Sequence, residues 1–400
     1  MTRVDLDHHA ISERVSALAP ELTSFRRQLH AHPELSWQEH QTTATLMARL
    51  EKSGLEPRVA PTGTGVLCDI GSGGPLVALR GDIDALPLRD TKAVPYRSTV
   101  EGVCHACGHD VHTTTVLGAG LALAGHLDRN PGSGRVRLIF QPAEEVVPGA
   151  AVSLVDAGVM HGVEAIYALH CDPAVEVGHV GLSVGPITSA ADLLSIRLHG
   201  AGGHTARPHR TADIVHIAAR IVVDLPMSLA RLSDPRDMVN VTFGAIHAGD
   251  AANVIPTEAS VAGSLRAAGR PSWEAAPERI RTLLAAIVDP LGATWELDHR
   301  IGAPPIDNDP VAVGHLDAAA HAVVGAKGIG PTVQSSGGED FSWYGDHAPA
   351  GFIRLGVHTP GEPMNDIHTG GFDVDERAIP IGARILAGAA LEGLAALAGD

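Results

Sequence analysis

Polar side chains that can bind metals recur just past apolar, strand-like stretches of this 400-residue chain. Three groups share this position: Cys107 with His109, Glu144 with Glu145, and His170. In an open α/β sheet the carboxyl ends of the strands form a crevice, and ligands bind there. The recurrence therefore predicts that these groups converge at one edge of a sheet.

The order of elements around these groups predicts an α/β fold. Apolar residues at helical spacing predict helices, and short apolar runs predict strands, at 11–31 (helix), 38–53 (helix), 65–70 (strand), 76–80 (strand), 109–127 (helix), 135–141 (strand) and 164–170 (strand). Strands that alternate with helices are typical of a mostly parallel sheet with helices on both faces.

The pattern changes near residue 188 and changes back near 300. Between these points the order is strand 192–198, helix 211–232, strand 238–246, strand 258–266, helix 272–288 and strand 294–297. This is the order of a ferredoxin-like α+β unit. We therefore expect a first domain from 1–187 and 300–400, with an inserted domain at 188–299. Helices at 310–323 and 376–398 and a strand at 351–356 complete the first domain.

Composition excludes some partners. The formal net charge of −17 argues against nucleic acid and against an anionic membrane surface, because both attract basic patches. No run approaches the roughly 18 apolar residues of a membrane span. The start of the chain, Met1–Ala10, lacks the apolar region of a secretory signal. The four cysteines could form pairs, but a chain of this length without a visible signal suggests a reducing compartment, so we expect a cytoplasmic protein.

Cys104 and Cys107 form a C-x-x-C pair that has several interpretations. A zinc ribbon needs a second such pair, which is absent, and a redox pair fits poorly beside the neighbouring histidines and glycine. Cys107 and His109 are two residues apart, so a thiolate and an imidazole can reach one metal. The alternative is that Cys107 is a small buried hydrophobic residue.

The acidic pair and the histidine also allow two interpretations each. Glu144 and Glu145 could be a solvated turn, or one could bind metal while the other acts as a general base. His170 could be a core histidine bonded to a carbonyl, or a ligand. Asp84 follows the strand at 76–80 and could orient a ligand histidine, or it could cap a turn.

Taken together, the motifs resemble the metal-dependent amidohydrolases of the aminoacylase and hippurate-hydrolase family, which includes hydrolases of auxin–amino-acid conjugates. The matching stretches follow the family order along nearly the whole chain: His30–Glu39, Arg80–Pro87, His105–His112, Phe140–Glu145, Gly202–His209, Asn253–Pro256, Gly337–Phe341 and His368–Glu376. The resemblance implies an aminopeptidase-like catalytic domain with a dinuclear metal site, and an inserted lid and dimerisation domain.

The resemblance also implies roles for individual residues. Two divalent ions per subunit (Zn, Mn, Co or Ni) would be held by five ligands: Cys107, His109, Glu145, His170 and His368. Glu144 matches the general base. In the inserted domain His204 matches the residue that stabilises the oxyanion, often from the partner subunit, and Asn253 matches a lid residue near the substrate. Arg266 could grip the substrate carboxylate by a bidentate pair, or could be a surface charge.

The implied activity is hydrolysis of the amide bond of an N-acyl amino acid, a small-molecule substrate, by a homodimer or higher homo-oligomer. Two alternatives stay open: an exopeptidase that acts on dipeptides, and a metal-binding homologue without catalysis. His368 is followed by Thr369-Gly370-Gly371, whereas the family more often has Ser or Asn and then Pro. This difference lies beside a predicted ligand and removes none.

Overall fold

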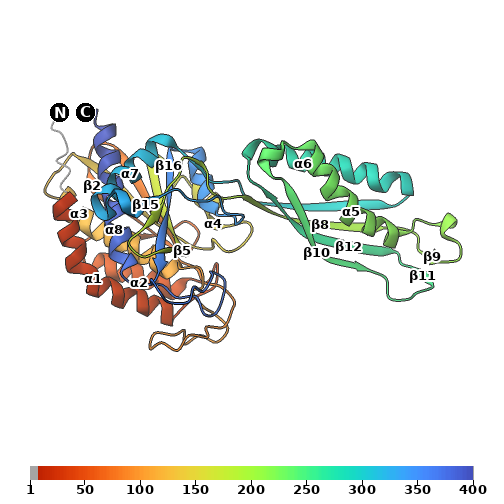
Figure 1. The fold of residues 1–400 in the computed structure, drawn as a ribbon, viewed down its shortest axis with the longest axis horizontal. Coiled ribbons are helices and arrows are strands. Elements are labelled where there is room, and N and C mark those ends of the chain that lie inside the picture. The colour runs from red at the N-terminus through yellow and green to blue at the C-terminus, as the bar shows by residue number, and fades with distance from the viewer. Residues whose placement is uncertain (1–7, 400) are drawn as a thin grey trace. The chain divides into compact units, whose positions relative to one another are not determined.

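The computed structural model describes residues 8–399, and these divide into two compact units. The first unit comprises the chain up to Ile187, Asp307–Val333 and the chain from Asp340 onward (Figure 1). The second comprises Thr188–Ile306 and Gln334–Glu339. Most of Met1–Ala10, which the sequence analysis examined for a signal segment, lies outside the described residues.

An eight-stranded sheet forms the centre of the first unit, in the order β1-β2-β4-β3-β5-β16-β6-β15. Its strands are β1 (Arg58–Val59), β2 (Val66–Ser72), β3 (Leu76–Asp82), β4 (Gly134–Gln141), β5 (Ala165–Glu176), β6 (Val180–Gly181), β15 (Ile329–Gly330) and β16 (Ala350–His358). The four middle strands, β4, β3, β5 and β16, are mutually parallel. The expected α/β fold with a mostly parallel sheet is confirmed. A two-stranded sheet joins β7 (Gly185–Pro186) to β14 (Asp307–Asn308).

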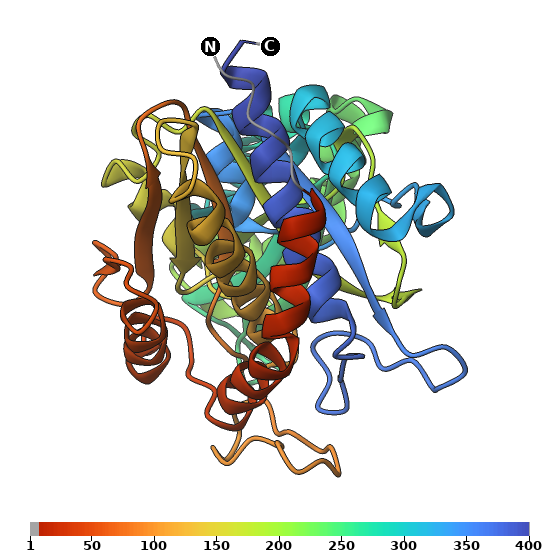
Figure 2. The same cartoon turned by 90° about the vertical axis from the view of Figure 1, so that its left-hand side faces the viewer.

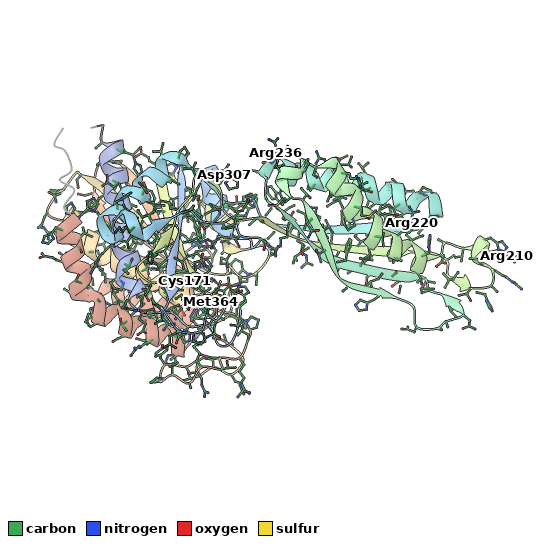
Figure 3. The ribbon with its side chains drawn as sticks, in the orientation of Figure 1. Cys171, Arg210, Arg220, Arg236, Asp307 and Met364 are labelled. Atoms are coloured by element: carbon green, nitrogen blue, oxygen red, sulfur yellow. The ribbon has the colours of Figure 1, made fainter. Side chains whose placement is uncertain are left out.

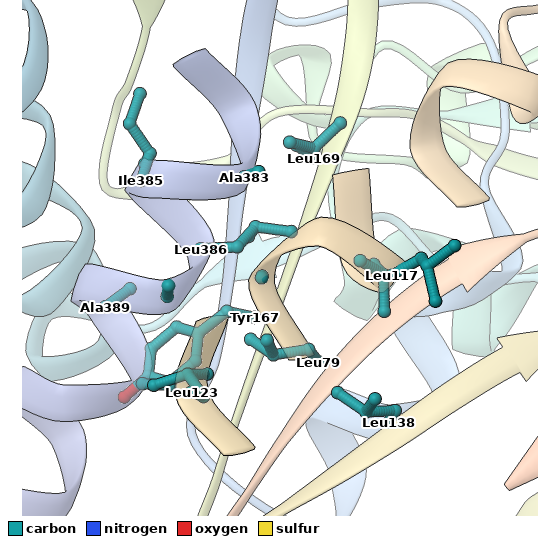
Figure 4. Close-up of a cluster of buried hydrophobic side chains, with 14 of the residues drawn as sticks. Leu79, Leu117, Leu123, Leu138, Tyr167, Leu169, Ala383, Ile385, Leu386 and Ala389 are labelled. Atoms are coloured by element: carbon teal, nitrogen blue, oxygen red, sulfur yellow. The ribbon is translucent and has the colours of Figure 1, made fainter. Parts of the chain in front are cut away.

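Six helices accompany this sheet: α1 (His8–Ala31), α2 (His40–Glu51), α3 (His109–Leu127), α4 (Ala150–Asp156), α7 (Pro310–Val324) and α8 (Ala378–Leu397). Helices α1, α3 and α8 pack against one another (Figure 2). The expectation that no run approaches a membrane span was wrong for α8, which is long and apolar enough to cross a membrane, but 78% of its apolar window is buried inside the protein. It packs instead against α3 and the sheet, where Leu386, Leu117 and Leu79 are buried (Figure 4).

One strand differs from its expected end. The sequence analysis ended the third apolar strand at His170, whereas β5 continues to Glu176. The strand is longer because β16 pairs with it up to Glu176. On its other side the pairing with β3 stops at Ala168, so His170 lies just past the last residue that β3 covers.

The second unit is a four-stranded antiparallel sheet in the order β10-β12-β8-β13, against which α5 and α6 pack (Figure 1). Its elements are β8 (Ala190–His199), α5 (Ile214–Leu232), β10 (Asn240–Ala248), β12 (Glu258–Ala267), α6 (Arg270–Val288) and β13 (Thr294–Ala303). A small sheet of β9 (Gly203–His204) and β11 (Val254–Ile255) extends from it. The succession of strands and helices is that of a split βαβ unit.

Two boundaries of the second unit lie elsewhere than the sequence indicated. The return to the first unit falls after Ile306 rather than at 299, because β13 continues to Ala303. The segment 334–339 also belongs to the second unit. The side-chain amide of Gln334 explains this, because it donates hydrogen bonds to the carbonyls of Thr188 and Ala268, both at 2.9 Å.

Candidate metal centre

Five side chains from distant parts of the first unit gather into two overlapping groups. The potential ligand atoms of Cys107, His109 and His170 all lie within 4.8 Å of one another. The same is true of Cys107, Glu145 and His368. Cys107 therefore belongs to both groups, as a ligand shared by two neighbouring ions would.

Local backbone geometry places Cys107 and His109. His109 is the first residue of α3, and Gly108 before it has a φ of 90°, in the left-handed region. Only glycine adopts this conformation at little cost. A Cβ on Gly108 would also lie 2.8 Å from the sulfur of Cys171. The glycine thus lets the chain turn sharply between the thiol and the imidazole.

Two of the three candidate ligand histidines, His109 and His170, are each oriented by a contact at Nδ1 that leaves Nε2 facing the centre. Nδ1 of His109 lies 3.1 Å from Oδ1 of Asp84, and Nδ1 of His170 lies 2.7 Å from the carbonyl of Cys171. Nε2 of His170 is then 3.4 Å from the sulfur of Cys107. An oxygen that accepts the Nδ1 proton fixes the tautomer in which Nε2 has a free lone pair, which is the form that binds metal.

The third candidate ligand histidine, His368, lies in a loop that is hydrogen-bonded to the segment carrying Cys107. The N–H of His368 donates to the carbonyl of Ala106 at 2.7 Å, and Nε2 of His368 lies 3.4 Å from Oε1 of Glu145. Further along the loop, the N–H of Thr91 donates to the carbonyl of Gly370 at 2.8 Å. A Cβ on Gly370 would lie 2.2 Å from the carbonyl of Arg89, so the departure from the family pattern at this position permits a close loop contact.

The electrostatic potential at the centre is negative, because several carboxylates surround it. Nε2 of His109 has Oδ2 of Asp82 at 3.8 Å, Oε1 of Glu145 at 3.7 Å and Oε2 of Glu144 at 3.9 Å. Burial lowers the pKa of His109, but the charges of Asp82, Asp84 and Glu145 outweigh it and raise the pKa to about 10. The close contact with the carboxylate of Glu145, against burial, likewise raises the pKa of His368. Carboxylates that stabilise a protonated imidazole stabilise a metal cation in the same place.

His170 differs from these two histidines. Burial, with smaller contributions from His112 and Arg354, holds its pKa well below the ordinary value, so its imidazole is neutral. A neutral imidazole is ready to bind metal without losing a proton.

Unpaired buried atoms test whether these residues fit a metal. Among residues 8–399, Nε2 of His109 and Oε1 of Glu145 are buried and have no hydrogen-bond partner. Buried polar atoms are almost always paired, so two such atoms facing each other call for a further partner. Thiolate, imidazole and carboxylate together suit divalent ions of the zinc type. The donor set therefore fits a metal.

His112 was not singled out by the sequence analysis, yet it is part of the support of the centre. Its Nδ1 lies 2.7 Å from Oδ1 of Asp82, and its Nε2 accepts the N–H of Cys171 at 2.9 Å. With both nitrogens engaged, His112 holds the backbone next to His170. Its position three residues after His109 on one helix was the available signal, since such residues share a face.

The three predicted residues of the inserted domain lie in the second unit. His204 and Asn253 are exposed neighbours, because His204 pairs with Val254 and the N–H of Thr205 donates to the carbonyl of Asn253. Arg210, which follows His204 in the chain, is also exposed and is labelled in Figure 3. Arg266 is partly buried near the opposite end of β12, and its Nη1 is 3.4 Å from the position of a Cβ on Gly338.

Comparisons with known proteins identify the class. Residues 78–392 match the model of peptidase family M20/M25/M40, and the chain belongs to this family. The chain is 36% identical over 371 residues to N-acetyl-L-cysteine deacetylase of Bacillus subtilis, covering 91% of this chain and 86% of that protein. The resemblance inferred from the sequence motifs is thereby confirmed.

A solved structure and a longer relative complete the comparison. The YXEP protein of Bacillus subtilis, described as a dinuclear metal-binding peptidase of the M20 family, superposes with a TM-score of 0.79 at 32% identity, covering 94% of this chain and 98% of that one. A Rhodococcus jostii protein named for glutamate–cysteine ligase 2-3 is 44% identical over 91% of this chain. The match covers 46% of that relative, so the chain spans about half its length.

Proposed function

We propose that this protein is a two-metal amidohydrolase that cleaves N-acyl amino acids into a carboxylic acid and a free amino acid. The observation that carries the proposal is the sharing of Cys107 by two groups of potential ligands. The similarity to a protein named N-acetyl-L-cysteine deacetylase supports the substrate class. The family name and the YXEP protein, a peptidase by description, are the reason to test dipeptides beside N-acyl amino acids.

In this proposal Cys107, His109, Glu145, His170 and His368 hold two divalent ions, of which Zn, Mn, Co and Ni all suit the donors. When bound, such ions polarise a carbonyl and make a water molecule more acidic. Asp84 orients His109 through Nδ1, as the sequence analysis expected of a ligand's hydrogen-bond partner.

Glu144 performs the proton transfers. Its carboxylate, 3.9 Å from Nε2 of His109, takes a proton from the water that attacks the amide carbon. The tetrahedral intermediate then collapses, the C–N bond breaks, and Glu144 delivers the same proton to the departing amine. One carboxylate thus serves both steps, and the products are the acid and the amine.

Glu144→Gln tests this role directly. The variant keeps the side chain's size and loses its basicity, so we expect kcat to fall by about 10²–10⁴-fold. Metal content, measured by plasma mass spectrometry, should equal that of the wild type. The assay is release of free amino acid from a panel of N-acyl amino acids and dipeptides by protein reloaded with each metal after chelation. Wild-type turnover in Glu144→Gln would remove the base assignment, and a metal-loaded wild type that cleaves none of the panel would remove the activity.

The inserted unit supplies the remaining roles in the proposal. His204 donates a hydrogen bond to the oxyanion from the partner subunit of a homodimer, Asn253 contacts the substrate, and Arg266 binds the substrate carboxylate. We also place the protein in the cytoplasm, because all four cysteines are buried and free.

Mixing two inactive variants tests the contribution of the partner. A dimer of one Glu144→Gln chain and one His204→Ala chain has a single intact site if His204 acts across the dimer. Random exchange makes half of the dimers mixed, so activity should recover to about a quarter of the wild-type value in a symmetric dimer. No recovery after exchange, confirmed by sedimentation of tagged mixed dimers, would place His204 in its own subunit's site.

A further inference from the structure

Two buried carboxylates hold the turn that carries Glu144, one on each side. The N–H of Ala143 donates to Oε1 of Glu39 at 2.8 Å, and the N–H of Glu145 donates to Oδ2 of Asp84 at 3.0 Å. We propose that Glu39 is a positioning residue that fixes the direction of the Glu144 side chain. This inference rests on the proposed role of Glu144 as the base.

The turn needs such support because its backbone is unfavourable. Ala143 has a φ of 49°, in the left-handed region that residues with a Cβ rarely adopt. Both of its backbone polar groups are engaged, since its carbonyl also accepts the N–H of Ala150 at 3.0 Å, where α4 begins. A strained conformation persists only where its surroundings impose it. Release of Ala143 would rotate the next residue, which is Glu144.

Glu39 is itself held rigidly. Its side chain is buried, Oε1 accepts a second N–H from Trp37 at 3.0 Å, and Oε2 accepts the hydroxyl of Thr64 at 2.9 Å. All these neighbours are donors, which suits a carboxylate. Gly65, which follows Thr64, lies so close to the end of β4 that a Cβ on it would be 2.7 Å from the carbonyl of Phe140. Glu39 therefore joins the start of α2, the start of β2 and the turn after β4.

A purely structural role for Glu39 would be to cap helix α2, which begins at the next residue. The side chain makes no such capping bond. Glu34 does so instead: its two carboxylate oxygens accept the N–H groups of Gln41 at 2.9 Å and Thr42 at 2.7 Å. Two glutamates five residues apart thus have separate tasks, one at the helix and one at the Glu144 turn. Glu34 is the matched control.

The test compares Glu39→Met, Glu39→Gln and Glu34→Met in metal-reloaded protein. Methionine fills the space of Glu39 without an acceptor, so we expect kcat to fall by about 10–100-fold, the cost of a misplaced catalytic group, with KM and metal content unchanged. Glutamine should restore most of kcat, because its oxygen can accept from Ala143 while its NH₂ donates to Thr64. Glu34→Met should lower the melting temperature and keep the wild-type kcat.

Hydrogen exchange supplies a readout that needs no activity. The Ala143 amide, followed by fragment mass spectrometry, should exchange at least about tenfold faster in Glu39→Met and at the wild-type rate in Glu34→Met. Should Glu39→Met fail to fold, Thr64→Val removes one support of the same carboxylate and should lower kcat by about two- to fivefold.

Wild-type kcat in the Glu39→Met or Thr64→Val variant, unchanged exchange at Ala143, or an equal loss of kcat in Glu34→Met would each overturn the inference. Failure of the proposed function has a different outcome. The wild type would then hydrolyse no amide in the panel, while the exchange of the Ala143 amide would still report whether Glu39 holds the turn.

Discussion

Two neighbouring regions of the first unit contain similar types of residue but differ in the cations that lie beside their carboxylates. One is the candidate metal centre around Cys107. The other is a buried ionic network around His30, in which His30, Asp90 and Cys104 also bring potential ligand atoms within 4.8 Å of one another. Residue types and spacing alone make both regions look like metal sites.

The ionic network contains its own cations. Nζ of Lys92 lies 3.1 Å from Oδ1 of Asp90 and 3.8 Å from the sulfur of Cys104. On the other side, Nε of the buried Arg26 lies 2.6 Å from Oδ2 of Asp110. Both nitrogens of His30 face carboxylates, with Nδ1 at 2.7 Å from Asp110 and Nε2 at 3.3 Å from Asp90.

At the candidate metal centre one buried arginine approaches: Nη1 of Arg80 lies 2.7 Å from Oδ2 of Asp82. The ion pairs of His109 and His368 are with the carboxylates of Asp82, Asp84, Glu144 and Glu145. His109 and His170 use Nδ1 for support and direct Nε2 toward the centre. The comparison teaches that a buried acidic cluster must obtain its positive charge somewhere, either from the chain or from an ion. At the centre around Cys107, Nε2 of His109 and Oε1 of Glu145 have no hydrogen-bond partner, and we propose that a metal ion supplies the positive charge between them.

The largest expected effect comes from changing one cysteine in each region. Cys107→Ser removes the ligand common to both groups, so metal content should fall and activity should drop by at least about 10³-fold, since the metal supplies the activated water. Cys104→Ser should retain metal and activity, because Lys92 balances that region. Metal loss in Cys104→Ser, measured on the same preparations, would break the distinction between the two regions.

A smaller effect is expected from removing an internal cation. Arg26→Met leaves Asp110 buried without its arginine, which should lower the free energy of unfolding by about 3–5 kcal/mol. Its neighbour Arg27 is the control: it is about half exposed and pairs with Glu376 at 2.6 Å, so Arg27→Met should cost at most about 1 kcal/mol. Urea denaturation of metal-free protein measures both, and equal values would contradict the assigned burial effect.

The sequence predicted much of the fold because apolar patterns are encoded locally, and local patterns singled out Cys107, His109, Glu145 and His170, whereas His368 entered the candidate set through the resemblance to the family. Apolar periodicity gives α3 and β4 to within a residue or two. Glu145 follows the apolar strand β4, as expected, but the expectation was wrong for Cys107, which lies in the loop just before α3 rather than past a strand. Side chains that follow parallel strands lie at the carboxyl edge of the sheet, where ligands bind. A polar residue after an apolar run in the sequence is therefore expected at that edge in the structure.

Two buried supporting residues, Glu39 and Arg26, could not be found in this way, whereas Asp84 was proposed from its place after a strand. Glu39 and Arg26 lie on or beside ordinary amphipathic helices, and a charged residue there is most often solvated. Their partners, Ala143 and Asp110, are more than eighty residues away and are brought close only by packing. The segment 334–339 was missed for the same reason, since its bonds to the second unit involve distant carbonyls.

The effect that is smallest per pH unit is a pH dependence of stability to which His30 of the ionic network contributes. Burial lowers the pKa of His30, but the charge of Asp110 and hydrogen bonds to Asp110 and Asp90 raise it to about 10. Because the folded pKa exceeds the unfolded one, this group's stabilisation is fully present below about pH 6.5 and is lost as pH rises toward 10. Stability should therefore fall across that window, by at most about 1.4 kcal/mol per pH unit from this residue.

Substitution of His30 isolates this contribution from that of the metal centre. His109 has a raised pKa of about 10 as well, so metal-free wild-type protein loses stability from both residues in the same window. In His30→Gln only His109 still contributes to the loss of stability with rising pH. The slope of the unfolding free energy against pH should therefore be shallower by the contribution of His30. Added metal replaces the proton of His109 and should flatten the rest. An unchanged slope in His30→Gln would mean that His30 is neutral in the folded protein, and that Arg26 and Lys92 alone balance Asp110 and Asp90.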